Sequence, residues 1–366
     1  MHNRRAWRAG LLTALLASLA SGIILAVAGR LLTSATVLGV FAGSVPTWLF
    51  LAVIPAVALL AFGVAWRLVS AHAQAFVLIS AFTQTRWLTG LLEDLSRSLD
   101  RHDIDLVVKL PQHDHSGRSQ LQQIATLRKK RRAYLGSFII FERPEHVRPQ
   151  LVALCREIGR PVVFIDVRPF GDAEAYPPRS AFVGCSAGEI GERAAQVVGK
   201  ELLDRGVEAP RVLVVAAESQ GDRQARFTST LREILPSAAV DVTVLGLFAR
   251  ERAREIVDRR IRHLGGRGER LDAIFCTNDE MALGAVDAVQ QRIAAGGSVD
   301  DLVILGVDGI AEATAAIQAG TTAFQATIVQ DTRRLAEVAV DILLRLRAGE
   351  RVPSETFIPT TVYPMQ

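Results

Sequence analysis

The sequence is poor in cysteine, which limits the kinds of site that it can form. Its 366 residues include three cysteines, Cys155, Cys185 and Cys276, and all three lie in or beside apolar segments. An odd number without pair-like spacing argues against a disulfide framework. We therefore expect buried free thiols, and these thiols do not suggest a metal site.

Nucleotide-binding motifs are also missing. No G-x-G-x-x-G sequence follows a predicted strand, so the phosphate-binding turn of a dinucleotide fold is lacking, and no Walker A sequence is present. We therefore expect no cofactor.

One hydrolase pattern occurs without convincing partners. Residues 184–188 (GCSAG) fit the G-x-S-x-G turn between a strand and a helix, with Ser186 as the candidate nucleophile. The only later histidine is His263, near the end of a predicted helix, where a catalytic base is poorly placed. We favour a turn of small residues over a nucleophile, and we expect no enzyme activity.

Two histidines form a weak candidate for metal binding. His113 and His115 flank Asp114 in a polar loop after a predicted strand, and nothing else with the spacing of metal ligands is nearby. We favour a solvated loop, with a metal pair as the alternative.

Positive charge is concentrated in one cluster. The formal net charge is +4, and the cluster occupies the end of a predicted helix at Arg128, Lys129, Lys130, Arg131 and Arg132. Cations favour a helix C-terminus, so a solvated helix end is our first interpretation. An anionic-lipid or nucleic-acid surface is the alternative. The lack of interleaved aromatics and of a preceding helix-turn-helix argues against nucleic acid as a partner.

Two uncharged apolar runs, residues 11–28 and 46–65, raise the hydrophobic content of the chain to 49%. Each run is near the ~20 residues that a helix needs to span a bilayer. We predict two transmembrane helices in an N-terminal membrane anchor, residues 1–70. Residues 26–28 resemble a signal-peptidase site, but the first run is longer than a usual signal core, so we favour an uncleaved anchor.

The side of the membrane depends on how many runs cross it. Arg4, Arg5 and Arg8 place the N-terminus in the cytoplasm by the positive-inside rule. Two spans return the chain to the cytoplasm, whereas one span places the rest of the chain outside. The connector at residues 67–74 is short, so the globular part must lie close to the membrane surface.

From residue 75 onward, short apolar strands alternate with helices. Strands that are buried on both faces read as continuous apolar runs, and repeated β-α units give parallel sheets. A first series extends to a loop at residues 168–179, and a second begins at Ser180 with a strand at residues 181–185. We predict an α/β fold of two Rossmann-like lobes with a ligand cleft between them.

The stretch at residues 271–290 (LDAIFCTNDEMALGAVDAVQ) provides the first candidate binding residue. An apolar strand runs into Asn278, Asp279 and Glu280, and a helix follows from Met281. Ligands of open α/β sheets bind beyond the carboxyl ends of the strands, which is where Asp279 falls. The alternative is that Asp279 or Asn278 only caps the helix.

Three phrases in the second series carry a family resemblance: FCTNDEMALGAVDAV (residues 275–289), VILGVDG (303–309) and ATIVQ (326–330). With them the chain resembles the ribose-type periplasmic sugar-binding proteins, which share their fold with the ligand-binding cores of the lactose-repressor family. The resemblance implies the periplasmic binding protein-like I fold, with three crossings between lobes. We expect an N-terminal lobe at residues 75–180 plus about 331–357, and a C-terminal lobe at 181–330 plus about 358–366.

The resemblance also implies binding residues. The family's site acids match Asp166 and Asp279, its arginine matches Arg223, and its hinge glutamine matches Gln330. Arg226 stands where the family has a glycine, and Arg168 lies one step after the usual place of a second arginine.

The start of the chain departs from the family pattern. The family has Asn-Pro-Phe-Phe after its first strand, and this chain has Thr85, Arg86, Trp87 and Leu88. Trp87 could cover the apolar face of a sugar, so Thr85 and Trp87 are added to the expected ligand contacts. The family's asparagine contact has no counterpart there.

The features predict a membrane-anchored solute-binding protein. The resemblance implies that its binding domain lies on the cell-envelope face of the inner membrane, whereas the two-span count leaves the cytoplasmic face open. It would bind a monosaccharide or polyol and present its closed form to an ABC transporter permease or a membrane sensor. The alternative is a membrane-tethered intracellular sugar-sensing regulator without a DNA-binding headpiece. An enzyme that uses Ser186 is the third and least favoured reading.

Overall fold

The computed structural model describes residues 73–79, 85–109, 118–141, 144–171, 176–217, 221–297 and 301–364, together with residues 56, 57, 59 and 62. By its internal contacts the chain divides into two compact units, Met1–His72 and Ala73–Gln366. The predicted spans at 11–28 and 46–65 lie outside the described residues, apart from those four positions. Within the described ranges, no helix has the length and apolar character to cross a membrane.

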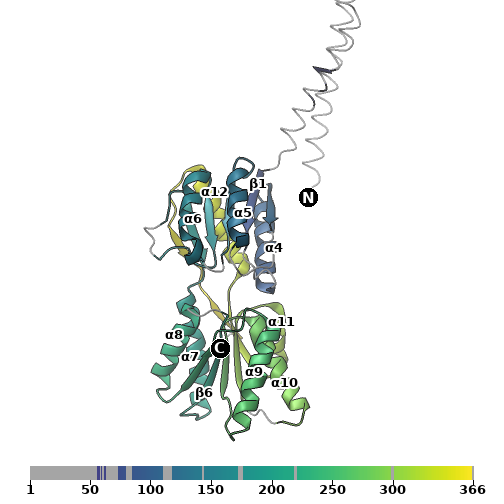
Figure 1. Cartoon of the computed structure of the whole chain (residues 1–366), viewed down its shortest axis with the longest axis vertical. Coiled ribbons are helices and arrows are strands. Elements are labelled where there is room, and N and C mark those ends of the chain that lie inside the picture. Colours follow the sequence, from purple (N-terminus) through teal and green to yellow (C-terminus); the bar gives the residue numbers. More distant parts are fainter. Residues whose placement is uncertain are drawn as a thin grey trace, which may run out of the picture. The chain divides into compact units, whose positions relative to one another are not determined.

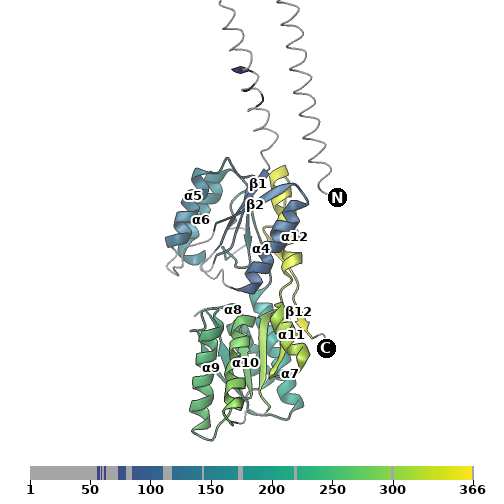
Figure 2. The same cartoon turned by 90° about the vertical axis from the view of Figure 1, so that its right-hand side faces the viewer.

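Ala73–Gln366 forms two α/β lobes, each with a six-stranded sheet (Figures 1 and 2). In the first lobe the strand order is β11-β5-β4-β3-β1-β2, and every pair is parallel. Its elements are β1 (Ala73–Leu78), α4 (Arg86–Asp100), β2 (Ile104–Lys109), α5 (Arg118–Lys129), β3 (Gly136–Ile139), α6 (Pro144–Ile158), β4 (Val162–Ile165), β5 (Ser180–Gly184), α12 (Thr332–Ala348) and β11 (Glu355–Phe357).

The second lobe has the strand order β12-β10-β9-β8-β6-β7. Its strands pair in parallel except for β12, which is antiparallel to β10 at the edge. Its elements are α7 (Ala187–Asp204), β6 (Arg211–Val215), α8 (Asp222–Ile234), β7 (Ala239–Thr243), α9 (Arg250–Gly265), β8 (Ala273–Cys276), α10 (Asp279–Ala294), β9 (Val303–Asp308), α11 (Ala311–Ala319), β10 (Phe324–Val329) and β12 (Thr361–Tyr363). The predicted two-lobed α/β fold is confirmed.

The chain passes between the lobes three times: from β5 to α7, from β10 to α12 and from β11 to β12. The prediction that residues 181–185 open the second lobe is wrong, because β5 pairs with β4 and β11 in the first sheet. The strand runs directly into α7, so the local pattern hides the crossing, and only the strand pairing reveals it. The last two strands, β11 and β12, lie one in each sheet.

Helix α4 shows how the local sequence sets these elements. The Thr85 side chain accepts a hydrogen bond from the Leu88 backbone N–H and caps the helix. The leucines at positions 88, 91, 95 and 99 recur at helical spacing, and all are fully buried. This apolar face holds α4 between α12 and β2.

Both sheets reverse their strand order at a central pair, β1 and β3 in the first and β6 and β8 in the second. Ligands of open α/β sheets bind beyond the carboxyl ends of the strands at such a switch point. A site is therefore expected after β1, β3, β6 and β8 and after the strands next to these pairs, which include β4 and β9.

Candidate functional site

Four polar side chains from both lobes meet where strands of the two sheets end. Asp166 follows β4 in the first lobe, Asp308 ends β9 in the second, and Gln330 follows β10 at a crossing. Arg223, in the first turn of α8, pairs with Asp166 (Nη2 to Oδ1, 3.9 Å) and donates to Gln330 Oε1 at 3.3 Å. Gln330 Nε2 donates to Asp308 Oδ1 at 2.8 Å. We call Asp166, Arg223, Asp308 and Gln330 the interlobe cluster.

Backbone groups hold this cluster in place. The second terminal nitrogen of Arg223 donates to the Thr277 carbonyl at 2.9 Å, at the end of β8. The indole N–H of Trp87 donates to the Gln330 carbonyl at 3.4 Å. The side chains of Arg223 and Asp166 remain 19% and 13% exposed, so they are mostly buried but still reach the surface.

Both acids of the cluster have a left-handed backbone. The φ angle is 74° at Asp166 and 121° at Asp308. Such conformations cost roughly 1–3 kcal/mol each in a residue with a side chain, and they are concentrated at binding and catalytic sites. The fold therefore holds these two carboxylates in place against a local preference.

Burial makes the negative charges of the cluster unfavourable. The pKa of Asp308 is raised well above its ordinary value, first by burial and then by the nearby charge of Asp279, while Arg223 and the Gln330 hydrogen bond oppose the shift. Burial also raises the pKa of Asp166, again against the attraction of Arg223. The guanidinium of Arg223 thus faces two carboxylates, Asp166 and Asp308. Additional hydrogen-bond donors, such as ligand hydroxyls, would stabilise their charged forms.

The predicted binding acid Asp279 is enclosed within the second lobe. It is fully buried, and its Oδ2 accepts from the backbone N–H groups of Gly309 (2.7 Å) and Ile310 (2.9 Å). Its Oδ1 accepts from the Thr327 hydroxyl at 2.7 Å. Burial raises the pKa of Asp279 to about 7, against these hydrogen bonds. In this structure Asp279 fixes the turn between β9 and α11.

The neighbouring residue Asn278 has an unused donor. Its Oδ1 accepts from the Met281 N–H at 3.0 Å, so Asn278 is the cap of α10, but its buried Nδ2 has no partner among the described residues. Asn278 directly follows Thr277, whose carbonyl accepts a hydrogen bond from Arg223. An unpaired buried N–H costs about 1–3 kcal/mol, which a ligand acceptor would remove. From the sequence we treat Asn278 only as a cap and Asp308 only as part of a family phrase. The signal for both is the same strand-end position that singles out Asp279.

Thr85 and Trp87 lie inside the protein. Both are buried, at 6% and 5% exposure, and the Thr85 hydroxyl serves as the cap of α4. The Trp87 ring belongs to the hydrophobic core, and its N–H contacts the chain at Gln330. Trp87 therefore links α4 to the same crossing that carries the cluster.

The two arginines that flank the family pattern point elsewhere. Arg168 donates to Glu355 Oε1 at 2.9 Å and to the Gly171 carbonyl at 2.8 Å. The exposed Arg226 pairs with Glu192 at 3.6 Å. Neither has a contact with the interlobe cluster among the described residues.

The hydrolase-like segment is a helix cap. The Ser186 hydroxyl accepts from the Glu189 N–H at 3.2 Å at the start of α7. The adjacent Cys185 is buried, and desolvation raises the pKa of its thiol to about 12. Cys155 and Cys276 are likewise buried and free, as expected. His113 and His115 lie outside the described residues, and in the described ranges no group of three or more His, Cys, Asp or Glu side chains could hold a metal.

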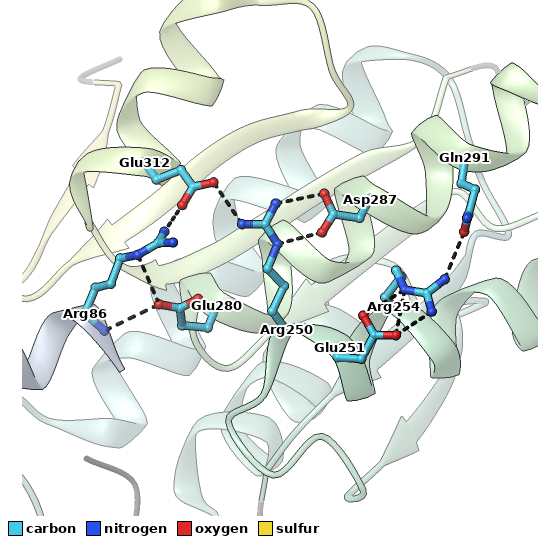
Figure 3. A network of polar contacts seen from close by, with 8 residues as sticks. All are labelled: Arg86, Arg250, Glu251, Arg254, Glu280, Asp287, Gln291 and Glu312. Carbon is cyan, nitrogen blue, oxygen red and sulfur yellow. Dashed lines mark hydrogen bonds and ion pairs between the residues drawn. The ribbon is translucent and has the colours of Figure 1, made fainter. Parts of the chain in front are cut away.

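Beside the cluster, an ion network joins the lobes at Arg86 (Figure 3). Arg86 lies in the first turn of α4 and pairs with Glu280 of α10 (Nε to Oε1, 3.9 Å) and with Glu312 of α11. The other Glu312 oxygen accepts from Arg250 at 2.8 Å, and Arg250 also binds both oxygens of Asp287, at 2.6 and 2.8 Å. In Figure 3, Arg254, Glu251 and Gln291 form a separate set nearby.

The arrangement suits a neutral ligand with several hydroxyl groups. Carboxylates accept hydrogen bonds, a guanidinium donates in a fixed fork, and hydroxyls do both. With two carboxylates and one arginine in a partly dry site, a negatively charged ligand would be repelled. The groups come from both lobes, so one ligand could contact the two together.

The model of the "Periplasmic binding protein domain" family matches residues 76–351 of the chain. A "Putative rhizopine-binding protein" of Rhizobium meliloti is 25% identical over 297 residues, which cover 79% of this chain and 90% of the relative.

Two solved structures share the fold. A periplasmic solute-binding protein of an ABC transporter from Actinobacillus succinogenes 130z, with bound D-allose, has a TM-score of 0.67 at 19% identity, covering 79% of this chain and 96% of its own. One from Bacillus halodurans C-125, with bound myo-inositol, has a TM-score of 0.64 at 20% identity, covering 80% and 94%. The chain belongs to the periplasmic binding protein domain family, whose members bind ligands and are not enzymes.

Proposed function

We propose that this protein is a membrane-anchored solute-binding protein that binds a monosaccharide or a polyol between its two lobes. The interlobe cluster is the observation that carries the proposal, because one short chain of contacts joins Asp166 of the first lobe to Asp308 of the second. The ligands bound to the two similar structures, D-allose and myo-inositol, are both neutral and rich in hydroxyls.

Each polar group has a proposed role toward such a ligand. Asp166 and Asp308 accept hydrogen bonds from ligand hydroxyls. Arg223 and the Asn278 Nδ2 group donate hydrogen bonds to ligand oxygens, and the Gln330 amide can do both. Asp279 acts indirectly, because its carboxylate holds the backbone after Asp308. Thr85 and Trp87 remain predicted contacts. They would reach a ligand only if α4 moved and their present hydrogen bonds, with Leu88 and Gln330, were broken.

A ligand that contacts both lobes favours the closed arrangement by its differential affinity for that state. The closed form would then be recognised by a permease of the ABC type or by a membrane sensor. The apolar runs at residues 11–28 and 46–65 would keep the protein at that partner's membrane.

Thermal unfolding tests the proposal directly. The purified full chain should be stabilised by at least one compound in a panel of hexoses, pentoses and polyols that includes D-allose and myo-inositol. A ligand at a hundred times its Kd adds about 2.7 kcal/mol. No stabilisation by any member of the panel would contradict sugar or polyol binding.

We further propose that the two lobes lie on the cell-envelope side of the inner membrane, following the habit of the family. Alkaline phosphatase and green fluorescent protein, each fused after Gln366, test this. Phosphatase activity without fluorescence supports it. Fluorescence without phosphatase activity would exclude delivery to a transporter's outer face and favour the intracellular sugar-sensing regulator.

A further inference from the structure

The turns that lead into the strands of the first sheet are rich in positive charge. All pairs in this sheet are parallel, so its six strands begin at one edge, which we call the amino edge. The interlobe cluster follows strand ends, so Asp166 lies at the opposite edge. Exposed basic residues occur in three turns of the amino edge: Lys129, Lys130 and Arg132 after α5, Arg160 before β4, and Arg347 and Arg351 around the end of α12.

Half of these basic side chains lie in the turn after α5. Among the described residues, the side chains of Lys129, Lys130 and Arg132 have no ion pair or hydrogen bond. Two acids of the same edge are already neutralised, since Glu157 pairs with Arg128 and Glu350 pairs with Arg345.

The remaining acids of the edge, Asp100, Asp103 and Asp105, lie in the turn between α4 and β2 and at the start of β2. Three carboxylates cannot balance the six basic residues of the three turns. The amino edge therefore has a net positive surface.

The basic turn after α5 lies beside the first described strand. The backbone N–H of Leu135, three residues after Arg132, donates to the Gln74 carbonyl at 2.8 Å. The rings of Tyr134 and Phe76 pack with their centroids 5.1 Å apart. Figure 1 shows β1 and α5 next to each other.

The sequence sets a short distance between this edge and the predicted anchor. The second apolar run ends at residue 65, and β1 begins at Ala73. Seven residues lie between them, and at about 3.3–3.6 Å per residue they span at most roughly 25 Å. The tether therefore keeps the amino edge near whatever surface holds the anchor.

We propose that the amino edge of the first lobe docks on the anionic phospholipid headgroups of the membrane that anchors the chain. The proposal rests on the anchor in the proposed function, but not on the identity of the ligand. Basic side chains within about one Debye length, 8–10 Å, are attracted to an anionic surface. Docking by this edge points the strand ends of the first sheet, and so Asp166, away from the bilayer.

The test uses the full chain in nanodiscs with a fluorophore at His102→Cys, an exposed position in the turn before β2. The three native cysteines are buried, so labelling is selective. Energy transfer to an acceptor-labelled lipid reports docking. Transfer should rise when about one third of the phosphatidylcholine is replaced by phosphatidylglycerol. It should fall back in about 0.5 M sodium chloride, where the Debye length is roughly 4 Å.

A matched pair of triple variants assigns the effect. K129E/K130E/R132E should lower the ratio of docked to undocked protein by at least about a hundredfold, since each of the three lost cations contributes roughly fivefold and the new carboxylates are repelled. The control R259E/R262E/R267E changes the net charge equally on α9 and the turn after it, in the second lobe, and should keep the wild-type transfer.

Several results would overturn the docking proposal. One is equal transfer in zwitterionic and anionic discs, and another is an equal loss in both triple variants. Binding of a duplex DNA that K129E/K130E/R132E abolishes, without any response to lipid, would assign the edge to nucleic acid. Failure of the full chain to float with zwitterionic vesicles would remove the anchor and docking with it, whereas stabilisation by a sugar would still support solute binding.

Discussion

Asp279 and Asp308 occupy equivalent places in the second lobe but have different surroundings. Each stands at the carboxyl end of an apolar strand, after β8 or at the end of β9. The oxygens of Asp279 are taken by two backbone N–H groups and the Thr327 hydroxyl. Asp308 accepts from Gln330, which also contacts Arg223 and so belongs to the chain of contacts that reaches the first lobe.

The difference shows what a strand-end position does and does not decide. It brings carboxylates to the edge where ligands bind, but the backbone around each one decides whether its oxygens are free. Asp279 binds the backbone directly after Asp308, at Gly309 and Ile310. It thereby helps to hold the Asp308 side chain in its orientation. Four substitutions test this division, and they follow from the largest expected effect to the smallest.

Replacing Asp279 with alanine should lower the free energy of unfolding by about 3–5 kcal/mol, because two buried N–H groups and one buried hydroxyl lose their hydrogen-bond acceptor. Chemical denaturation measures this loss. The exposed Glu233→Ala on α8 is the control and should change stability by no more than about 0.5 kcal/mol. A loss below about 1 kcal/mol for Asp279→Ala would contradict its structural role.

Replacing Arg223 with alanine should weaken binding of the stabilising sugar by about 2–4 kcal/mol, or roughly 30- to 1,000-fold, because it leaves two buried carboxylates without their cation. Calorimetric titration gives the affinity. Arg226→Ala removes an exposed arginine from the same helix and should leave the affinity within about twofold. Equal losses in both variants would exclude a specific role for Arg223.

Asp308→Asn should separate binding from stability. The asparagine keeps an acceptor for Gln330 but loses the charge, so we expect affinity to fall by about tenfold while the ligand-free protein becomes more stable.

The pH dependence gives the sign of this effect. The pKa of Asp308 is higher in the folded chain than in the unfolded chain, so the folded state binds more protons. The wild type therefore loses stability relative to Asp308→Asn as pH rises above the unfolded value near 4, by at most about 1.4 kcal/mol per pH unit. Denaturation at several pH values checks it, and a stability gap that shrinks with pH would contradict the raised pKa.

Arg86→Ala should have the smallest effect on stability, below about 1 kcal/mol, since the side chain is 53% exposed. Because Arg86 joins the lobes, its loss should reduce the salt dependence of ligand affinity. Arg97→Ala is the control, since Arg97 pairs with Asp94 of the same helix at 2.8 Å. Identical salt dependence in the two variants would show that the Arg86 network does not bias closure.

Much of the fold could be predicted because its signals are local. Continuous apolar strands alternate with capped amphipathic helices, and this local pattern predicts the alternating α/β architecture that the structure has. The crossing after β5 could not be predicted, because strand, turn and helix follow one another there in the same way as within a lobe. Strand pairing, which is not local, decides the lobe to which β5 belongs.

The candidate site could be predicted only in part for the same reason. Asp166, Arg223 and Gln330 meet in the structure. The role of Asp279 depends on whether the N–H groups of residues 309–310 reach its carboxylate, which packing decides. Trp87 is a residue type that stacks on sugars. In the structure its ring lies in the hydrophobic core, and its indole N–H donates to the distant Gln330 carbonyl.

Hydrogen exchange of the full chain, with and without the stabilising sugar, tests the central claim most directly. If one ligand bridges the lobes, the backbone N–H groups around Asp166 in the first lobe should exchange more slowly when the sugar is bound. Exchange should slow in parallel around Asn278 and Asp308 in the second lobe and around Gln330 at the crossing after β10. Protection confined to one lobe, or absent from all four segments, would contradict a site built from both.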